Sequence, residues 1–569
     1  MRNIDMAAAL GDNSTLTGDG EAPSPSTAYG RKRGGWKSTL FILAALAGSA
    51  LASSGWLSNL IVFLIEEFNI KSIDAAQISN VIAGSTCFFP VIAAIVADSF
   101  LGCFTVIWIS SLISVTGLIL MVLTAKLDVL RPQPCEHTRS ICPTPTTTQY
   151  AVLYSALALL SIGLGGTRFT MASMGANQFT EPKNQAVYFN WYFVTLYISS
   201  VIASTGIVYV EDRVSWAWGF CICLVANVFG LAMFLLGSRY YYEDKPEGSP
   251  FTSLARVIVA SVRKIKKSVA SFETEDYYCG DGGVEGMVPS KSFRILNRAA
   301  IKTEGDILPN GRVAKPWKIC TVQELEDLKC IIRIIPLWST SIFLGTPIGI
   351  QASLSVLQAL NMDRNLSRHF QVPAGSIMVV PFVSTAICLS VFDRYISPLW
   401  KKIRGKNLTP LQQIGLGHVI NTASMAVSAL VESKRRHVAA HSLQPQGSNI
   451  VVALSVVWLV PQLATVGIGE AFHFPGQVAL YYQEFPDSLK NMSSAMSAML
   501  IGIAFYLSTA VIDFLRRVTP WLPDNINDGR LDNVYWVLVV LGVINFAYYL
   551  LCSWFHKYKI VEKEDYDHK

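Results

Sequence analysis

Three features of the sequence predict an all-α membrane protein with twelve transmembrane helices arranged as two six-helix halves. Hydrophobic residues make up 51% of the 569-residue chain and charged residues only 15%, whereas a soluble domain has roughly 25% charged residues. The apolar residues gather in runs of about 20, the length that spans a bilayer as a helix. One long polar stretch interrupts this series of runs at its midpoint.

The apolar runs define the expected helices and the limits of the domains. The first six runs cover 39–65, 76–97, 104–125, 150–170, 187–209 and 215–237. The second six cover 331–351, 372–392, 412–431, 450–471, 492–514 and 534–555. The chain then divides into a polar tail (1–35), a first bundle (36–237), a central segment (238–329), a second bundle (330–555) and a second tail (556–569).

The polar segments indicate which side of the membrane each end occupies. The tail over 1–35 lacks the apolar core of a signal peptide, so we expect a disordered cytosolic tail. The central segment contains GSPFTSLARVIVASVRKIKK, whose pattern indicates an amphipathic helix, either on an anionic leaflet or in solvent. Basic loops such as RYISPLWKKIRGKN favour a cytosolic central segment and cytosolic termini, although the run Lys434, Arg435, Arg436 falls on the opposite side.

Composition and cysteine spacing exclude several classes of function. The basic residues lie in loops beside apolar runs, without a nucleic-acid-binding motif. No cysteine or histidine cluster has metal-ligand spacing, and we expect no cofactor. No nucleophile–base constellation or phosphate loop indicates an enzyme. Cys135 and Cys142 lie in a polar, proline-rich loop and would form a disulfide if that loop faces an oxidising space.

Two ionisable residues stand well inside apolar runs and are the main candidates for function. Arg168 lies in the fourth run and Glu470 in the tenth, in opposite halves of the chain. An unpaired charge at the bilayer centre costs about 2.5–3.5 kcal/mol, so such residues usually have partners or face a cavity. We expect a cross-half ion pair, either breaking during a transport cycle or static. His473 follows one helical turn after Glu470, where it could tune the protonation of that carboxyl or be structural.

Motifs along nearly the whole chain resemble the plant nitrate/peptide transporter family, the proton-dependent oligopeptide branch of the major facilitator superfamily. In order they are GGWK (34–37), ADSFLG (97–102), GTRF and GANQF (166–179), FNW (189–191), GSPFTS (248–253), FRILNRAAI (293–301), WKICTVQELEDLK (317–329), MDR (362–364), VPAGS (372–376), TPLQQIGLGH (409–418), VPQL (460–463) and FPDSLKNMSSAM (485–496). Each motif is weak alone, and their order and spacing make the set specific.

The resemblance implies a substrate cavity between the halves, with Arg168 and Glu470 at the family's gate positions. Helix 1 departs from the family, because Leu46, Ser49 and Ala50 stand where proton-coupled members carry the three charges of an E-x-x-E-R signature. Ile348 occupies the place of the family's nitrate-importing histidine. This combination is most similar to the nitrate excretion subgroup. The residues that we expect to line the pocket are Ser49, Ser53, Tyr197, Trp338 and His473.

Three functions remain open from the sequence. The first is a carrier of a small anion, nitrate foremost, acting in efflux across the plasma membrane in preference to the vacuolar membrane, with protons as optional partners. The second keeps the fold and carries a glucoside or an alkaloid, because serines in helix 1 leave room for a bulky neutral solute. The third is a non-transporting sensor, against which the retention of Arg168 and Glu470 argues. The oligomeric state is undetermined.

Overall fold

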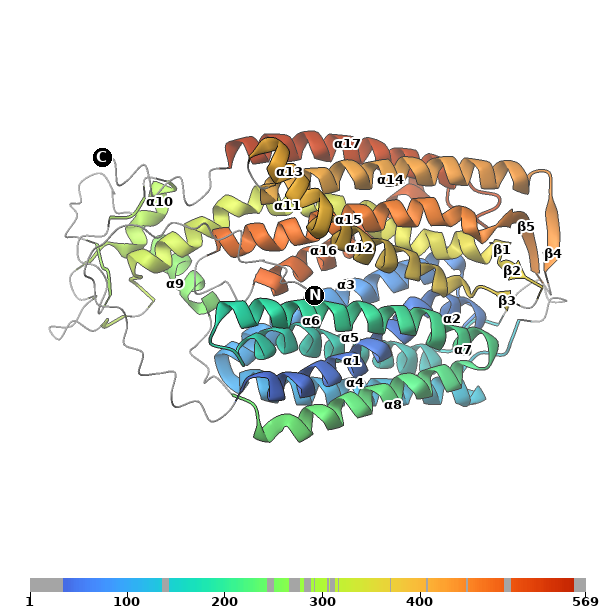
Figure 1. The fold of residues 1–569 in the computed structure, drawn as a ribbon, viewed down its shortest axis with the longest axis horizontal. Coiled ribbons are helices and arrows are strands. Elements are labelled where there is room, and N and C mark those ends of the chain that lie inside the picture. Colours follow the sequence, from blue (N-terminus) through green and yellow to red (C-terminus); the bar gives the residue numbers. More distant parts are fainter. Residues whose placement is uncertain are drawn as a thin grey trace.

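The computed structural model is described for most of the chain. The described residues are 34–135, 143–242, 250–265, 277–280, 288–290, 292–303, 306, 313–315, 317–368, 370–405, 408–446, 449–485 and 493–556. Within these ranges the molecule consists of two bundles of long helices lying side by side, with the helices of the central segment at one end (Figure 1).

The first bundle contains six helical crossings, three of which are built from more than one helical piece. They are α1 (Trp36–Ser58) with α2 (Leu60–Glu66), α3 (Ser72–Val96) with the π-turn η3 (Ala97–Leu101), α4 (Gly102–Lys126), α5 (Thr147–Ala176), α6 (Pro182–Ile202) with η5 (Ala203–Ile207) and α7 (Val208–Arg213), and α8 (Trp216–Leu236). Helices α1 and α8 approach closely at two glycines. A Cβ atom on Gly48 would lie 2.4 Å from the carbonyl oxygen of Ala226.

The second bundle repeats this plan after the central helices α9 (Pro250–Arg263) and α10 (Arg294–Asn297). Its helices are α11 (Val322–Leu360), α12 (Val379–Val391) with η10 (Ala374–Met378) before it and η11 (Phe392–Ile396) and α13 (Ser397–Arg404) after it, α14 (Pro410–Ala439), α15 (Val460–Glu484), α16 (Ser493–Val518) and α17 (Leu531–Phe555). Capping boxes, in which a threonine and a residue three positions later exchange hydrogen bonds, begin α5, α11 and α14.

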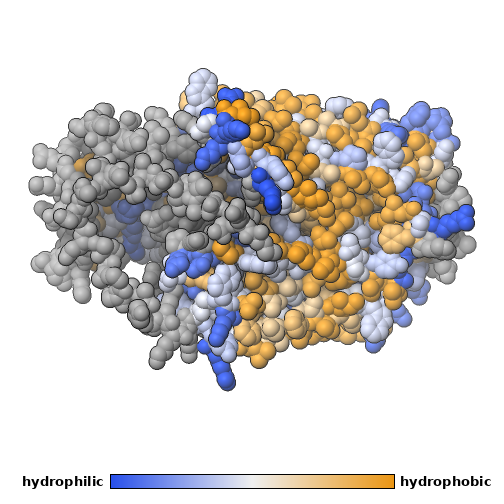
Figure 2. Space-filling view, in the orientation of Figure 1, coloured by the Kyte–Doolittle hydropathy of each residue, from blue (hydrophilic) through white to orange (hydrophobic). Residues whose placement is uncertain are grey.

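Among the described residues, ten helical segments are long and apolar enough to cross a membrane, and one of them, Ser72–Lys126, contains both α3 and α4. Helix α15 is not among the ten, because Glu470 and neighbouring polar residues lower its hydropathy, yet it packs between α12 and α14 as a crossing does. The face in Figure 2 has an apolar belt over the bundles, with hydrophilic residues toward their ends. The expected all-α architecture of two six-helix halves is therefore present.

Three expected boundaries differ from the structure. The run 450–471 is not one helix, because Asn449–Ser455 forms strand β5, which pairs with β4 (Leu443–Gln446) and β1 (Met362–Asp363). Val451 and Val452 are buried there, so their β-branched side chains made a strand resemble a span. Helix α11 begins at Val322, before the expected limit at 330. Asn59 divides the first crossing into α1 and α2.

Helix α9 packs against protein, although a lipid surface was one expectation for its apolar face. Val257 and Ala260 are fully buried in a cluster with Val322 and Leu325 of α11. Arg256 forms an ion pair with Glu324 at 2.9 Å. The central segment is thereby fixed to the start of the second bundle.

The two ends of the molecule are clearly distinguishable. We call the end with α9 and α10 the α9 end, and the opposite end, with α2, α7 and the strands β1–β5, the strand end (Figure 1). Besides the sheet of β1, β5 and β4, a short antiparallel pair joins β2 (Asn365–Ser367) and β3 (Phe370–Gln371).

Candidate functional site

Arg168 lies on α5 of the first bundle and has no acidic partner among the described residues. It is half-buried on α5, and its guanidinium carbon lies 6.0 Å from the ring centroid of Phe169. The backbone carbonyl of Arg168 accepts a hydrogen bond from the Tyr192 hydroxyl at 2.8 Å. Among the ion pairs of the described residues, none within 4.0 Å includes Arg168. Its positive charge is therefore uncompensated by a neighbouring carboxylate.

Glu470 is half-buried on α15 of the second bundle and likewise has no cationic partner within 4.0 Å among the described residues. Tyr197 of α6, one of the expected pocket residues, interacts electrostatically with both Glu470 and Arg168. Both charges therefore lie within electrostatic range of Tyr197. The structure does not join them in the expected ion pair in this conformation.

A small cavity of the second bundle lies beside Glu470's helix. It is lined by Ser341, Gly345 and Ile348 of α11 and by His473 and Gln477 of α15, among others. The position where the resemblance implied a missing histidine, Ile348, therefore borders a cavity that His473 also borders. His473 is buried and its ring lies edge-on to that of His418, with centroids 5.6 Å apart. Its Nδ1 atom has no hydrogen-bond partner among the residues that the structure describes.

The other expected pocket residues have contacts within their own bundles. Trp338 lies against Tyr481 and Phe485, with ring centroids 6.1 and 6.2 Å apart. The hydroxyls of Ser49 and Ser53 donate to the carbonyls of Leu46 and Ala50 in the same helix, at 3.0 and 3.2 Å. Both serines are half-buried. Their donor capacity is already used by the helix.

Cys135 is disulfide-bonded, and Cys142 lies outside the described residues, so the pairing of these two stays a prediction. The described part of the chain holds no group of three or more His, Cys, Asp or Glu side chains that could bind a metal ion.

The bundles are joined to each other toward the strand end. Within the described ranges, the side-chain hydrogen bonds and ion pairs between bundles are Lys71–Asp524, Asp74–Arg516, Asn80–Ser353, Ser85–Tyr506, Asp212–Arg364 and Arg213–Gln371. These contacts begin at the strand end and reach no deeper than the middle of α3. The conformation is therefore closed at the strand end.

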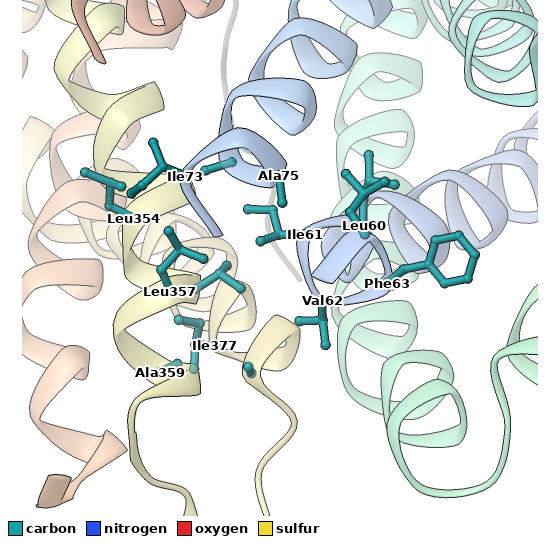
Figure 3. Close-up of a cluster of buried hydrophobic side chains, with 14 of the residues drawn as sticks. Leu60, Ile61, Val62, Phe63, Ile73, Ala75, Leu354, Leu357, Ala359 and Ile377 are labelled. Carbon is teal, nitrogen blue, oxygen red and sulfur yellow. The ribbon is translucent and has the colours of Figure 1, made fainter. Parts of the chain in front are cut away.

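An apolar plug completes this closure. It brings Leu60, Ile61 and Val62 of α2 together with Ile73 of α3, Leu354 and Leu357 of α11 and Ile377 of η10 (Figure 3). All of these side chains are at most 6% exposed. Burial of this much apolar surface excludes water from the strand end of the interface. The plug was not predicted, because its contacts join segments distant in sequence, and three of its residues, Ile73, Leu354 and Leu357, lie outside the expected apolar runs.

The sequence analysis also missed two buried polar groups. Glu432 and Arg435 of α14 form an ion pair in which both side chains are 0% exposed. Glu211 of α7 accepts a hydrogen bond from Asn59 at 3.1 Å, and both residues are at most 2% exposed. The run Glu211, Asp212, Arg213 at the end of the fifth span was the signal that could have found the second group.

Comparison with known proteins places this architecture in a family. The model of the POT family (PTR2) matches residues 104–526. Protein NRT1/ PTR FAMILY 2.7 of Arabidopsis thaliana is 50% identical over 556 residues, which are 97% of this chain and 98% of the relative. Protein NRT1/ PTR FAMILY 2.6 of the same plant is 48% identical over 555 residues, with the same coverage.

Solved structures show the same fold at lower identity. An auto-inhibited POT family peptide transporter has a TM-score of 0.64 and 15% identity, with 92% of this chain and 98% of that chain covered. The POT family transporter PepTSo has a TM-score of 0.65 and 16% identity, with 92% of this chain and all of that chain covered. These similarities confirm the expectation that the protein is a multi-pass membrane transporter and not an enzyme. The chain belongs to the plant NRT1/PTR branch of the POT family.

Proposed function

We propose that this transporter carries a small anion, nitrate foremost, by alternating access and mainly in the direction of efflux. The observation that carries the proposal is the guanidinium of Arg168, which is half-buried on α5 and has no carboxylate within 4.0 Å among the described residues. A charge of this kind is costly in the membrane unless water or a ligand meets it. A guanidinium offers a planar set of donors that suits a trigonal oxyanion.

Helix 1 supports a mechanism that does not depend on protons. Leu46 and Ala50 are 1% and 3% exposed in the first bundle, and Ser49 bonds to its own helix, so the positions of the family's E-x-x-E-R charges hold no titratable group. Moving one charge through 100 mV is worth about 2.3 kcal/mol. An anion therefore leaves a cell with a negative interior without a coupled proton.

Arg168 and Glu470 are proposed as the gate residues of the cycle. They stand apart while the strand end is closed, and Tyr197 lies near both. Closure of the bundles at the α9 end would bring α5 and α15 closer and allow the two charges to pair. In that state Glu470 would compete with the anion for Arg168, which would promote release of the anion at the strand end.

The strand end is proposed to face the outside of the cell, which makes the plasma membrane the site of efflux. The disulfide-bonded Cys135 lies in the loop between α4 and α5 at this end, and disulfides persist in oxidising compartments. The run Lys434, Arg435, Arg436 is compatible with this side, because Arg435 is neutralised by Glu432 and Arg436 pairs with Asp532 at 2.8 Å.

The proposal is tested by efflux from oocytes preloaded with labelled nitrate, measured against voltage and external pH. Arg168→Ala should lower efflux by more than about tenfold, because hydrogen bonds to a charged group contribute roughly 1.5–3 kcal/mol. The matched control is Arg517→Ala, since Arg517 is 77% exposed in α16. Full activity of Arg168→Ala, or a strict requirement for a proton gradient, would overturn the proposal.

A transported glucoside or alkaloid is the outcome to examine if correctly localised protein moves no nitrate. The serines that favoured a neutral solute have their hydroxyl protons engaged by the carbonyls of α1, and Ser54 pairs with Ser200 at 2.9 Å. Ser49 and Ser53 can therefore accept hydrogen bonds from a solute, while their hydroxyl protons are engaged within α1. The anion is therefore the better supported cargo.

A further inference from the structure

Glu211 and Asn59 form an incomplete polar pair at the closed strand end. Glu211 belongs to α7 and is 2% exposed, and Asn59 lies between α1 and α2 and is 1% exposed. The Asn59 amide donates from Nδ2 to Oε2 of Glu211 at 3.1 Å. The remaining oxygens, Oε1 of Glu211 and Oδ1 of Asn59, are both buried, and neither receives a hydrogen bond from the part of the chain that the structure describes. One proton placed between these two acceptor oxygens would supply the donor that they lack.

Both bundles cover this pair. A Cβ atom on Gly375, in η10 of the second bundle, would lie 2.5 Å from Oδ1 of Asn59. A Cβ atom on Gly219, in α8 of the first bundle, would lie 2.1 Å from Cγ of Glu211. The apolar plug begins with the next residue after Asn59, Leu60 (Figure 3). Separation of η10 from the first bundle would therefore expose Oδ1 of Asn59, and with it the Glu211 carboxyl, to water from the strand end.

The surrounding charges do not favour a carboxylate at Glu211. Asp212 is the next residue, and its cationic neighbours are Arg213 at 3.2 Å and Arg364 of the second bundle at 3.7 Å. These guanidinium groups are thus already directed to another carboxylate. The element α8 contributes the thiol of Cys223, which interacts electrostatically with Glu211.

The helix α2 adds further negative charge. Glu66 interacts with Asp212 and Arg364, and Glu67 forms an ion pair with Arg131. No cation among the described residues lies within 4.0 Å of Glu211. Burying an unpaired carboxylate is strongly unfavourable, whereas a protonated carboxyl is neutral and gains a donor.

We propose that Glu211 is a proton-binding site that links opening of the strand end to the pH of the solution on that side. With the bundles closed, the carboxyl holds a proton on Oε1, which supplies the donor that the Glu211–Asn59 pair lacks. When η10 separates from the first bundle, water hydrates the carboxylate and the proton leaves to the aqueous phase at the strand end. This inference rests on the alternating access of the proposed function, but not on nitrate as the cargo.

The sign of the pH effect follows from linkage. The closed state binds the proton more tightly than the open state does, so acid on the strand-end side favours the closed state and alkali favours the open state. One proton limits the effect to a tenfold change in the equilibrium per pH unit. Efflux through the strand end should therefore increase as the external solution becomes more alkaline.

The test measures opening itself. Val62, fully buried in the plug, is replaced by cysteine in the full-length protein, and its reaction with a membrane-impermeant thiol reagent is followed in intact cells from about pH 6 to about pH 8. The thiol becomes more reactive with rising pH on its own. The quantity compared is therefore the ratio of labelling rates between a background with Glu211 and one with Glu211→Gln.

Glutamine mimics the protonated carboxyl, because it accepts from Asn59 and donates from its own amide. We expect the ratio of labelling rates to rise severalfold, and by no more than about tenfold, per pH unit. The matched control is Asp128→Asn, a carboxyl of the same end whose side chain is 94% exposed, and its ratio to the unmodified background should stay constant. A constant ratio for Glu211→Gln, or a ratio that rises equally for Asp128→Asn, would overturn the proposal.

A second variant covers the case in which Glu211→Gln does not reach the membrane. Glu211→Asp keeps a titratable carboxyl. In this variant the labelling rate of Val62→Cys should therefore rise with pH more steeply than the labelling rate of an exposed reference cysteine, whose increase reflects thiol chemistry alone. Loss of that excess in Glu211→Asp would contradict the proton site. Because labelling requires no substrate, a protein that moves no nitrate still gives a result, and failure of the cargo proposal is separable from failure of this one.

Discussion

Glu432 and Arg435 in α14 pair directly, whereas Arg168 in α5 and Glu470 in α15 stand apart. The first two are 0% exposed and share two hydrogen bonds of 2.8 Å, with Gln358 donating a third bond to Glu432 at 2.7 Å. Arg168 and Glu470 are half-buried, and within the described ranges neither forms an ion pair shorter than 4.0 Å. The same residue types therefore have two different environments within one membrane domain.

The difference separates a structural charge pair from the pair of residues that we propose as the gate. Glu432 and Arg435 are three residues apart on one helix, so no motion between bundles can part them. Arg168 and Glu470 belong to different bundles, and each motion of one bundle against the other changes their separation. A charge that binds a substrate has to be free of an ion pair in at least one state of the transporter. Of these four residues, only Arg168 and Glu470 meet this condition.

The largest expected effect concerns the structural pair. Arg435→Ala leaves Glu432 as an unpaired buried carboxylate, which should cost about 3–5 kcal/mol of stability. The measurement is the midpoint of thermal unfolding in detergent, followed by size-exclusion chromatography. The control is the double variant Glu432→Leu with Arg435→Met, which should recover part of the loss. An unchanged midpoint for Arg435→Ala would show that the pair is not structural.

The pairing of charges was the part of the site that the sequence could not supply. Arg168 and Glu470 were predicted because a charge in an apolar run is visible locally. Arg435 was read as part of a basic run beside a membrane end, since nothing local shows that it turns inward to Glu432, Asn527 and the backbone of Ile526. The partner of each charge depends on packing between segments distant in sequence.

The fold itself was largely predictable, because transmembrane helices follow from local hydropathy and length. The two-bundle arrangement and most helices agree with the expectation. Strand β5 was not predicted because its pairing with β4 and with β1 is a tertiary contact. The division of the first crossing at Asn59 was missed for a similar reason, since Asn59 is held there by Glu211 of α7.

The second effect concerns Glu470 alone. Glu470→Gln keeps the size of the side chain and removes the charge that would compete with the anion for Arg168. We expect nitrate efflux to fall about fivefold, equivalent to about 1 kcal/mol of lost ion pairing, with unchanged thermal stability. The control is Asp513→Asn, whose carboxylate is 45% exposed in α16. Unaltered efflux in Glu470→Gln would remove this residue from the gate.

A smaller effect is expected at Lys434, the neighbour of Arg435. Its Nζ lies 3.3 Å from the ring centroid of Trp458, which anchors the end of α14 to the segment before α15. Lys434→Gln should lower stability by about 0.5–1 kcal/mol, the range of an exposed cation–π contact. Lys434→Arg should retain most of this contact. Equal midpoints for the two variants and the parent chain would show that the contact adds nothing.

The smallest change in stability is expected at Arg168, where transport is affected most. Arg168→Leu removes a charge that has no acidic partner and leaves no carboxylate exposed to apolar surroundings, so the unfolding free energy should change by no more than about 0.5 kcal/mol. Arg435→Leu, with the same side chain introduced, should lose several times more, because Glu432 stays behind. If both variants destabilise equally, Arg168 has a hidden structural partner. Arg168 would then be a structural charge like Arg435, and the distinction between the structural pair and the proposed gate residues would be wrong.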